Sequence, residues 1–305
     1  MALKIKKFNK ISWINIIEPE AEDFKYLTDN YKFHPLDIKD IRGEAQRSKI
    51  DVYAMYAFII LRFPVTYKDS HLLGSHELDI FLGKDYVITI QKKKLKLLNQ
   101  YFYRVVNNKK LQHEIFQGKA AHVLYHILDH LYSSSFVIID WLAKEINQIE
   151  EKVYQEDTRQ SVKDLGQARR NILFYRSIID PQRFVIKSLV NLKKDYLSGD
   201  LANYFDDISD YIERIYSNLS NEKDLIDGLH ETNESLTSYR LNRVMKILTI
   251  FSVSMLPLTL FTGLYGMNVQ SLPLIHNENL VWWIFGGLMV VIVGIFVWLK
   301  WKDII

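Results

Sequence analysis

Two long uncharged segments near the carboxyl end of the chain limit its fold more than any other feature. Residues 247–268 are 22 consecutive residues without Asp, Glu, Lys, Arg or His, and residues 281–299 are 19 more. A helix needs roughly 20 apolar residues to cross the hydrocarbon core of a bilayer. A buried helix of a soluble protein rarely runs so long without a charge. The two segments therefore predict a membrane hairpin, with spans at about 247–267 and 281–299.

The basic residues that flank the two spans predict their orientation. No Lys or Arg stands between Lys246 and Lys300, whereas both outer flanks are basic. By the positive-inside rule, both chain ends lie in the cytoplasm and the short connecting loop lies outside. Tryptophans near the ends of the second span are typical of interfacial anchors; they are Trp282, Trp283, Trp298 and Trp301. We expect a multi-pass protein of the cell (inner) membrane, embedded in the lipid bilayer.

The remaining sequence has the composition of a cytoplasmic part. The first ten residues, MALKIKKFNK, lack the apolar stretch of a secretory signal peptide. The chain has no cysteine, which excludes disulfides and thiolate zinc sites and suits a reducing cytosol. A formal net charge of +3 is too small to indicate a nucleic-acid partner. The sequence also lacks the spaced glycines of a phosphate-binding loop, so we expect no nucleotide partner.

Hydrophobic periodicity divides the chain ahead of the spans into two regions. The first combines short strands and short helices: strands at 11–17, 52–63, 78–82 and 86–90, the last two as a hairpin, and helices at 19–31 and 34–41. The second is helical, with patterns at about 110–156, 159–196 and 203–265. The last pattern continues into the first span. We therefore predict three parts, at 1–108, 109–242 and 243–305.

A stripe of residues along the first span recurs at the period of a packed helix. Its members are separated by steps of 3, 3, 4, 4, 3 and 4 residues, which average 3.5. A helix with that period keeps one side turned toward partner helices. Polar and small residues occur in it among apolar ones, whereas a lipid-facing side favours large aliphatic residues. The stripe consists of Asn242, Met245, Leu248, Ser252, Leu256, Thr259 and Gly263.

The end of the first span has features of an ion site. Pro257 frees the carbonyl of Val253, which is tolerated where protein or water can satisfy that oxygen. Gly266 permits a turn that a side chain would hinder, and this turn can bring the Asn268 amide over the helix end. One helix cannot enclose a pore, but a closed ring of copies can. A ring of neutral Asn268 oxygens suits hydrated Mg²⁺. The alternative interpretation is that Asn268 only caps a helix.

The same residues resemble a known family. YGMN at 265–268, which closes the first of two C-terminal spans, is similar to the signature of the CorA magnesium-transporter family. The stretch 242–268 resembles the pore helix of that family, while FHPLDIKDI (33–41) and LGKDYVITI (82–90) resemble its N-terminal domain in the same order. The resemblance implies an α+β cytoplasmic domain of α/β/α type, long stalk helices and a two-helix transmembrane hairpin, assembled as a funnel-shaped homopentamer.

The resemblance also implies roles for individual residues. The outer selectivity motif would be Tyr265, Gly266, Met267 and Asn268. The pore lining would follow the stripe, with Gly263 and Thr259 outermost, then Leu248 and Met245 as a hydrophobic constriction, and Asn242 at the inner mouth. The implied function is passive Mg²⁺ influx. An inside-negative potential favours inward movement of a dication by about 4.6 kcal/mol per 100 mV, which is twice the single-charge value.

The loop after the motif departs from the family pattern, which leaves other interpretations open. The family usually carries an acid directly after a Met-Pro pair, whereas here Leu274 follows Pro273 and the only acid between the spans is Glu278. A zinc-transporting branch carries a variant motif, so the intact Met267 favours magnesium. The alternatives are a transporter of zinc or of another transition dication such as Co²⁺ or Ni²⁺, and a non-conducting membrane-anchored scaffold. No nucleophile–base pairing indicates an enzyme.

Acidic residues on the predicted stalk helix form a candidate Mg²⁺ sensor. Steps of 3, 4 and 3 place Asp224, Asp227, Glu231 and Glu234 on one helix face. Such a face is also what an ordinary solvated helix presents. In a ring of stalks these carboxylates would crowd at subunit borders, where bound Mg²⁺ would neutralise them and keep the ring closed. The resemblance matches Asp224 and Glu231 by position, and Asp69 is the candidate partner from a neighbouring N-terminal domain.

Three histidines form a second candidate metal site. His122, His126 and His130 follow one another at steps of four and share a helix face with Asp129. A pair of histidines four residues apart on a helix is a spacing that zinc sites use. The alternative interpretation is a polar face turned toward a neighbouring helix.

Overall fold

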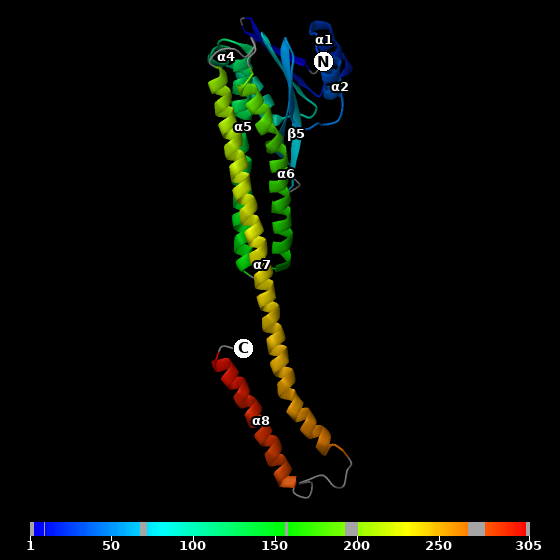
Figure 1. Cartoon of the computed structure of the whole chain (residues 1–305), viewed down its shortest axis with the longest axis vertical. Coiled ribbons are helices and arrows are strands. Elements are labelled where there is room, and N and C mark those ends of the chain that lie inside the picture. The colour runs from blue at the N-terminus through cyan, green and yellow to red at the C-terminus, as the bar shows by residue number, and fades with distance from the viewer. Residues whose placement is uncertain are drawn as a thin grey trace. The chain divides into compact units, whose positions relative to one another are not determined.

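The chain divides into two compact units, Met1–His230 and Glu231–Ile305, and the border between them falls inside one long helix. The computed structural model describes residues 3–8, 10–67, 72–155, 158–192, 201–267 and 278–302. Unit 1 contains all of the described strands and most of the helices (Figure 1). Unit 2 contains the carboxyl-terminal part of helix α7 (Leu201–Tyr265) and helix α8 (Glu278–Trp301).

A six-stranded mixed sheet is the centre of unit 1. Its strands are β1 (Leu3–Phe8), β2 (Ile11–Ile17), β3 (Lys49–Val52), β4 (Tyr56–Thr66), β5 (Leu73–Gly83) and β6 (Tyr86–Gln91). Their order across the sheet is β1-β2-β6-β5-β4-β3. Only β2 and β6 are parallel, and every other neighbouring pair is antiparallel. The predicted strand at 11–17 and the hairpin of 78–82 with 86–90 are both present.

Alternation of apolar side chains along the central strands gives the sheet two buried faces. On β4, Phe58 and Ile60 belong to one core cluster, whereas Ile59 and Leu61 belong to the other. Because successive side chains of a strand point to opposite faces, a strand that is apolar at every position is covered on both sides. Helices α1 (Ala21–Asn30) and α2 (Pro35–Arg42) cover the first face. The expected α/β/α arrangement is confirmed.

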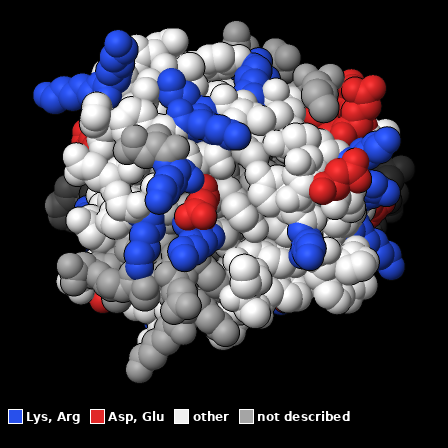
Figure 2. All heavy atoms as spheres, turned by 90° about the horizontal axis from the view of Figure 1, so that it is seen from above, with Lys and Arg blue, Asp and Glu red and all other residues white. Residues whose placement is uncertain are grey.

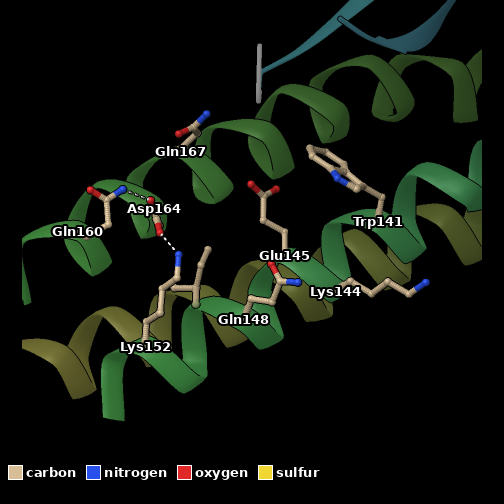
Figure 3. Close-up of a pocket in the computed structure, with 9 residues that line it drawn as sticks. Trp141, Lys144, Glu145, Gln148, Lys152, Gln160, Asp164 and Gln167 are labelled. Carbon is tan, nitrogen blue, oxygen red and sulfur yellow. Dashed lines mark hydrogen bonds and ion pairs between the residues drawn. The ribbon is translucent and has the colours of Figure 1, made fainter. Parts of the chain in front are cut away.

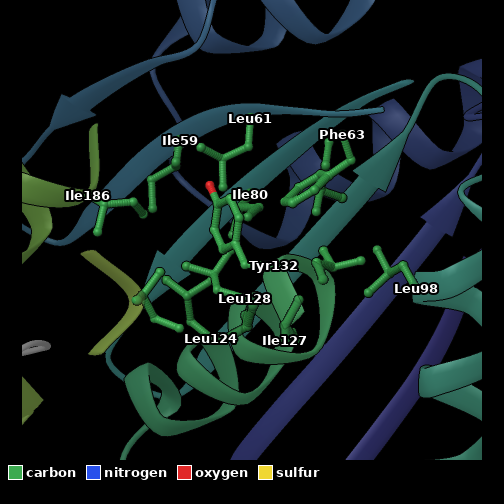
Figure 4. Close-up of a cluster of buried hydrophobic side chains, with 14 of the residues drawn as sticks. Ile59, Leu61, Phe63, Ile80, Leu98, Leu124, Ile127, Leu128, Tyr132 and Ile186 are labelled. Atoms are coloured by element: carbon green, nitrogen blue, oxygen red, sulfur yellow. The ribbon is translucent and has the colours of Figure 1, made fainter. Parts of the chain in front are cut away.

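The second face packs against the longer helices. They are α3 (Lys96–Asn107), α4 (Lys109–Ile115), α5 (Ala120–Tyr154), α6 (Thr158–Val190) and the first part of α7. Figure 4 shows Leu124, Leu128 and Tyr132 of α5 against the strand side chains of this face. In Figure 1, α5, α6 and the first part of α7 run side by side in unit 1. Helices α5 and α7 share one core cluster through residues such as Leu142 and Ile215.

Several element boundaries differ from the prediction. The single strand expected at 52–63 is interrupted by a turn, where the Tyr53 N–H donates to the Tyr56 carbonyl, so that β3 and β4 form an antiparallel pair. The single helix expected at 110–156 breaks at Gly118, whose φ of 96° is a left-handed conformation that favours glycine. The helix expected at 159–196 ends at Val190. Strands β1 and β3 and helix α3 were not predicted.

Both predicted spans lie in long apolar helices. The helices Asn203–Tyr265 and Asn279–Trp301 each contain a window long and apolar enough to cross a membrane, and neither window is buried within the protomer. Helix α7 therefore continues from the helical pattern that begins near residue 203 into the first span, as predicted. Pro257 lies inside it.

The end of the molecule that Figure 2 presents carries both signs of charge. Lysine and arginine side chains stand there singly and in small groups, acidic side chains lie among them, and uncharged surface separates them. A mixed surface of this kind agrees with the small formal charge of +3.

Candidate functional site

The stripe predicted along the first span lies on an exposed side of α7. All seven of its residues are exposed in the protomer: Asn242, Met245, Leu248, Ser252, Leu256, Thr259 and Gly263. Leu256 is 65% exposed and Leu248 is 56% exposed. An ideal Cβ built on Gly263 meets nothing within 4 Å. This side of α7 is therefore free, within one protomer, to contact other copies or to line a pore.

The half-buried side of α7 in the same stretch lies opposite the stripe. Its residues are Ile250, Ser254, Leu258, Phe261 and Tyr265. Each follows a stripe residue by two positions, which corresponds to about 200° around a helix of 3.6 residues per turn. Helix α8 contacts this side, because the ring centroids of Phe261 and Phe285 are 6.0 Å apart. Helix α8 thus leaves the stripe uncovered.

The first span ends at a glycine whose backbone is closely packed. The Gly266 N–H donates to the Thr262 carbonyl oxygen at 2.8 Å, and the Met267 N–H donates to the Leu264 carbonyl oxygen at 3.4 Å. An ideal Cβ built on Gly266 would lie 2.9 Å from that same Thr262 oxygen, closer than real Cβ atoms come to a backbone oxygen. The selectivity motif predicted at 265–268 therefore has a local reason for its glycine. Asn268 itself lies outside the described residues.

The acidic face predicted on the stalk helix is divided between exposed and paired carboxylates. Asp224 is 77% exposed, and its carboxylate lies 3.4 Å from Lys223 Nζ. Glu231 is also exposed. Asp227, in contrast, forms ion pairs with Lys223 at 2.8 Å and with Arg169 of α6 at 3.0 Å. Asp69, the predicted ligand from a neighbouring N-terminal domain, lies outside the described residues.

The two cations change the electrostatics of Asp227. The hydrogen bond from Lys223 lowers the pKa of the Asp227 carboxyl, and the charge of Arg169 lowers it further. The pKa of Lys223 is raised by its hydrogen bonds to Asp227 and Asp224. Asp227 therefore stays ionised and occupied by cations of its own protomer. The other three acids of this face, Asp224, Glu231 and Glu234, are exposed.

The three histidines of α5 contact aromatic rings rather than one another's ring nitrogens. His130 stacks on Tyr101 of α3 with centroids 4.3 Å apart, and His122 meets Tyr204 of α7 at 5.4 Å. Burial lowers the pKa of both histidines. Among the described residues, no group of three or more His, Cys, Asp or Glu side chains is arranged to hold a metal ion. The geometry favours the interpretation of a polar face toward neighbouring helices.

A polar pocket of about 510 Å³ lies between α5 and α6 in unit 1 (Figure 3). Lys152 Nζ and Gln160 Nε2 each lie 2.7 Å from the Asp164 carboxylate on its rim. Figure 3 shows Glu145 directed from α5 toward α6. Lys152 of α5 thus forms an ion pair with Asp164 of α6 beside the pocket.

Sequence reasoning missed the cations that occupy Asp227. Lys223 stands four residues before Asp227, which is the spacing of a helical ion pair, so the sequence contained that signal. Arg169 is 58 positions earlier in the chain and reaches Asp227 only because α6 packs beside α7. The Gly266 contact was likewise not visible in the sequence, because it depends on the backbone of the last helical turn.

The chain is similar to known metal-ion transporters along most of its length. The family described as "CorA-like Mg2+ transporter protein" matches residues 8–300. The "Cobalt/magnesium transport protein CorA" of Thermotoga maritima is 30% identical over 86% of this chain and 74% of its own length. The protein of the same name from Methanocaldococcus jannaschii is 25% identical over 95% of this chain and 90% of its own length.

A solved structure supports the same fold. The structure described as "The complete structure of CorA magnesium transporter from Methanocaldococcus jannaschii" superimposes with a TM-score of 0.83 at 22% identity, and the match covers 96% of this chain and 92% of that one. Since the family match spans almost all of the chain and both apolar helices lie within it, the chain belongs to the CorA-like Mg²⁺ transporter family, whose members are membrane transporters of divalent cations and not enzymes.

Proposed function

We propose that the chain forms a homopentameric channel that admits Mg²⁺ passively and is gated by Mg²⁺ in the cytoplasm. The observation that carries the proposal is the exposed stripe of α7, which faces away from α8 and ends at the closely packed Gly266. A symmetric ring of such helices would bury the stripe around a pore. We retain the division into 1–108, 109–242 and 243–305 as part of this proposal, with both termini in the cytoplasm of an inner-membrane protein.

The proposed conduction path follows the stripe from Asn242 to Asn268. Met245 and Leu248 would form an apolar constriction that gates by excluding water. The Thr259 hydroxyl donates to the Met255 carbonyl at 2.9 Å, so the helix itself satisfies this polar group. A ring of Asn268 amide oxygens at the outer end suits a cation that keeps its water shell, which Mg²⁺ gives up reluctantly. Relatives named cobalt/magnesium transport proteins support Mg²⁺ as substrate, with Co²⁺ as a second one.

The test of conduction is uptake into liposomes that hold the purified protein and a magnesium-sensitive dye, at an imposed inside-negative potential. We expect flux in the wild type and a loss of roughly tenfold or more in Asn268→Ala, because each subunit loses a hydrogen-bonding group worth about 1 kcal/mol. The oligomer is checked by size exclusion. Absence of Mg²⁺ flux in the wild type would contradict the proposal. Parallel assays with Co²⁺, Ni²⁺ and Zn²⁺ separate a different substrate from a scaffold that conducts nothing.

The proposed gate uses two exposed carboxylates of the α7 acidic face, those of Asp224 and Glu231. Mg²⁺ bound near Asp224 and Glu231 at subunit borders would offset their mutual repulsion, and loss of Mg²⁺ would loosen the ring. Asp227 is not part of this set, because Lys223 and Arg169 already neutralise it. Asp69 is retained as the proposed partner from a neighbouring subunit.

Removing the exposed pair is expected to release the gate. In Asp224→Ala with Glu231→Ala, the internal Mg²⁺ concentration that halves the flux should rise several-fold, because the carboxylates that Mg²⁺ would bridge are absent. Asp227→Asn is the matched control: it removes a charge from the same face, and it should leave the inhibition unchanged. Unaltered inhibition in the double variant would exclude this gate, and an effect in Asp227→Asn alone would move the sensor to the α6–α7 ion pair.

A further inference from the structure

Beneath α2, the sheet of unit 1 carries two carboxyl groups on one strand. Glu77 and Asp79 are two residues apart on β5, so both side chains point to the face covered by α1 and α2. Phe81, the next residue in this alternation, belongs to the core cluster of that face. Glu77 is 4% exposed and Asp79 is 0% exposed. Acids so far from water need either a counter-charge or a proton.

Glu77 has a counter-charge. Lys92 Nζ lies 2.5 Å from Glu77 Oε1, and the Gln46 N–H donates to Glu77 Oε2. The same ammonium group donates to the backbone carbonyls of Asp40 at 3.0 Å and Glu44 at 3.3 Å. The Lys92 ammonium is the ion-pair partner of Glu77 and a donor to two backbone carbonyls. Lys92 thus ties the end of α2 and the connection at 43–48 to the edge of the sheet.

Asp79 has no such partner. Its cross-strand neighbours are Ile60 of β4 and Ile90 of β6, both fully buried. Among the described residues, neither of its carboxyl oxygens has a hydrogen-bond donor. Its carboxyl is on the same side of β5 as that of Glu77, two residues away, and the Glu77 charge raises the pKa of Asp79. Two carboxyl groups can share a hydrogen bond only when one of them is protonated.

The other charged groups near Asp79 have contacts of their own. Arg62, whose Cα pairs with that of Glu77, donates through Nη2 to Ser75 Oγ at 2.6 Å, while its buried Nε has no hydrogen-bond partner among the described residues. Asp40 accepts from Lys49 Nζ at 2.7 Å and from Gln46 Nε2 at 2.8 Å. Lys49 also holds Asp51 at 2.6 Å. Burial raises the pKa of the Asp79 carboxyl well above its usual range; the charges of Glu77 and Asp40 raise it further, and Lys92 opposes them.

We propose that Asp79 and Glu77 form a proton-binding site that holds one proton at neutral pH, with Asp79 as the protonated partner. The Asp79 O–H then donates to the Glu77 carboxylate, and one negative charge faces the single ammonium of Lys92. When the proton leaves to solvent, two carboxylates compete for Lys92, and the contacts that seat 43–48 on the sheet weaken. This pH-sensitive device does not rest on the proposed channel function and needs no divalent cation.

The direction of the pH effect follows from the raised pKa. Between the ordinary pKa of aspartate, about 3.9, and the raised value in the folded state, the folded protein binds one more proton than the unfolded chain. Stability therefore falls as pH rises through that window, by about tenfold in the folding equilibrium constant per pH unit. Above the pKa of Asp79 in the folded state, the stability no longer falls as pH rises.

The test compares Asp79→Asn with wild type in the full-length protein in detergent micelles. Asparagine has the same shape, stays neutral and keeps a donor toward Glu77. Urea unfolding gives the folding equilibrium constant of each protein. The constant of the variant divided by that of the wild type should increase with pH, by up to about tenfold per pH unit. In addition, the infrared spectrum of the wild type at pH 7 should contain the C=O stretch of a protonated carboxyl group, which disappears at alkaline pH and is absent from the variant.

Asp85→Asn in the exposed β5–β6 turn is the matched control. It also replaces a carboxylate by an amide, and its folding constant should keep a pH-independent ratio to wild type while the infrared band remains. A wild-type spectrum without the protonated-carboxyl band, or a band that survives in Asp79→Asn, would overturn the proposal. If Asp79→Asn does not fold, the infrared pH titration of the wild type alone decides: a band that is lost at alkaline pH supports the site, and no band refutes it.

Discussion

Alanine at position 266 is expected to abolish cation flux while leaving the protomer folded. Its Cβ would lie 2.9 Å from the Thr262 carbonyl oxygen, a backbone atom that cannot move aside as the end of a side chain can. The last turn of α7 must open instead, at a cost of about 1–3 kcal/mol. This movement displaces Met267 and the predicted Asn268 ligand, and in a symmetric ring every subunit repeats it. Dye-reported Mg²⁺ uptake into liposomes measures the effect, together with the size-exclusion profile of the oligomer.

Gly294→Ala in α8 is the matched control for this experiment. A Cβ at that position meets nothing within 4 Å in the protomer, although the substitution is the same and the residue lies in the other span. Flux is expected to stay within about twofold of wild type, as for a substitution that changes stability by less than 0.5 kcal/mol. Wild-type flux in Gly266→Ala would show that the close contact with Thr262 does not control the mouth of the first span.

Methionine at position 92 is expected to cause the largest loss of stability in unit 1, about 3–5 kcal/mol. The Lys92 ammonium is the counter-charge of Glu77, whose side chain is only 2% exposed. Methionine keeps the length of the side chain but removes the charge, so a buried carboxylate loses its partner. The carbonyls of Asp40 and Glu44 lose a donor as well. Urea unfolding of the full-length protein, followed by far-ultraviolet circular dichroism, gives the change in free energy.

Two further variants identify the source of that loss. Lys84→Met removes a lysine from the exposed β5–β6 turn and is expected to change the free energy of unfolding by less than about 0.5 kcal/mol. Adding Glu77→Gln to Lys92→Met removes the uncompensated charge, so the double variant is expected to be more stable than Lys92→Met alone. If Lys92→Met costs no more than Lys84→Met, the Lys92–Glu77 pair does not hold α2 and 43–48 on the sheet.

Much of the membrane part could be predicted from the sequence, because its determinants are local. The absence of charge from residues 247–268 is a property of the chain itself, and both apolar helices are present where they were expected. The 3.5-residue stripe predicted a special side of the first span. The stripe residues are exposed in the protomer and lie opposite the half-buried residues around Phe261, since the period of a helix depends only on its backbone geometry. Their role at a pore stays a prediction.

Prediction was weaker where remote or special contacts decide the structure. The apolar run at 52–63 looks continuous, yet β3 ends at Val52 because it must turn back to pair with β4. The helical pattern around residue 118 also looks continuous, and only the left-handed conformation of Gly118 separates α4 from α5. Strand β1 went unrecognised because it is a lysine-rich edge strand with one side partly open to water, and its apolar alternation is short.

The sequence by itself indicated two membrane spans, an α/β/α part ahead of them, and one patterned side on the first span. Helical period, hydropathy and the placement of charges depend on residues that are close together in the chain, so they can be recognised from the sequence alone. Only the tertiary structure decided which acids are available to cations. Asp227 and Asp224 look equivalent in the sequence, but Arg169 reaches Asp227 across the α6–α7 contact. Likewise, the isolation of Asp79 among Ile60 and Ile90 arises from strand pairing, because electrostatic interactions depend on distance in space rather than on separation along the chain.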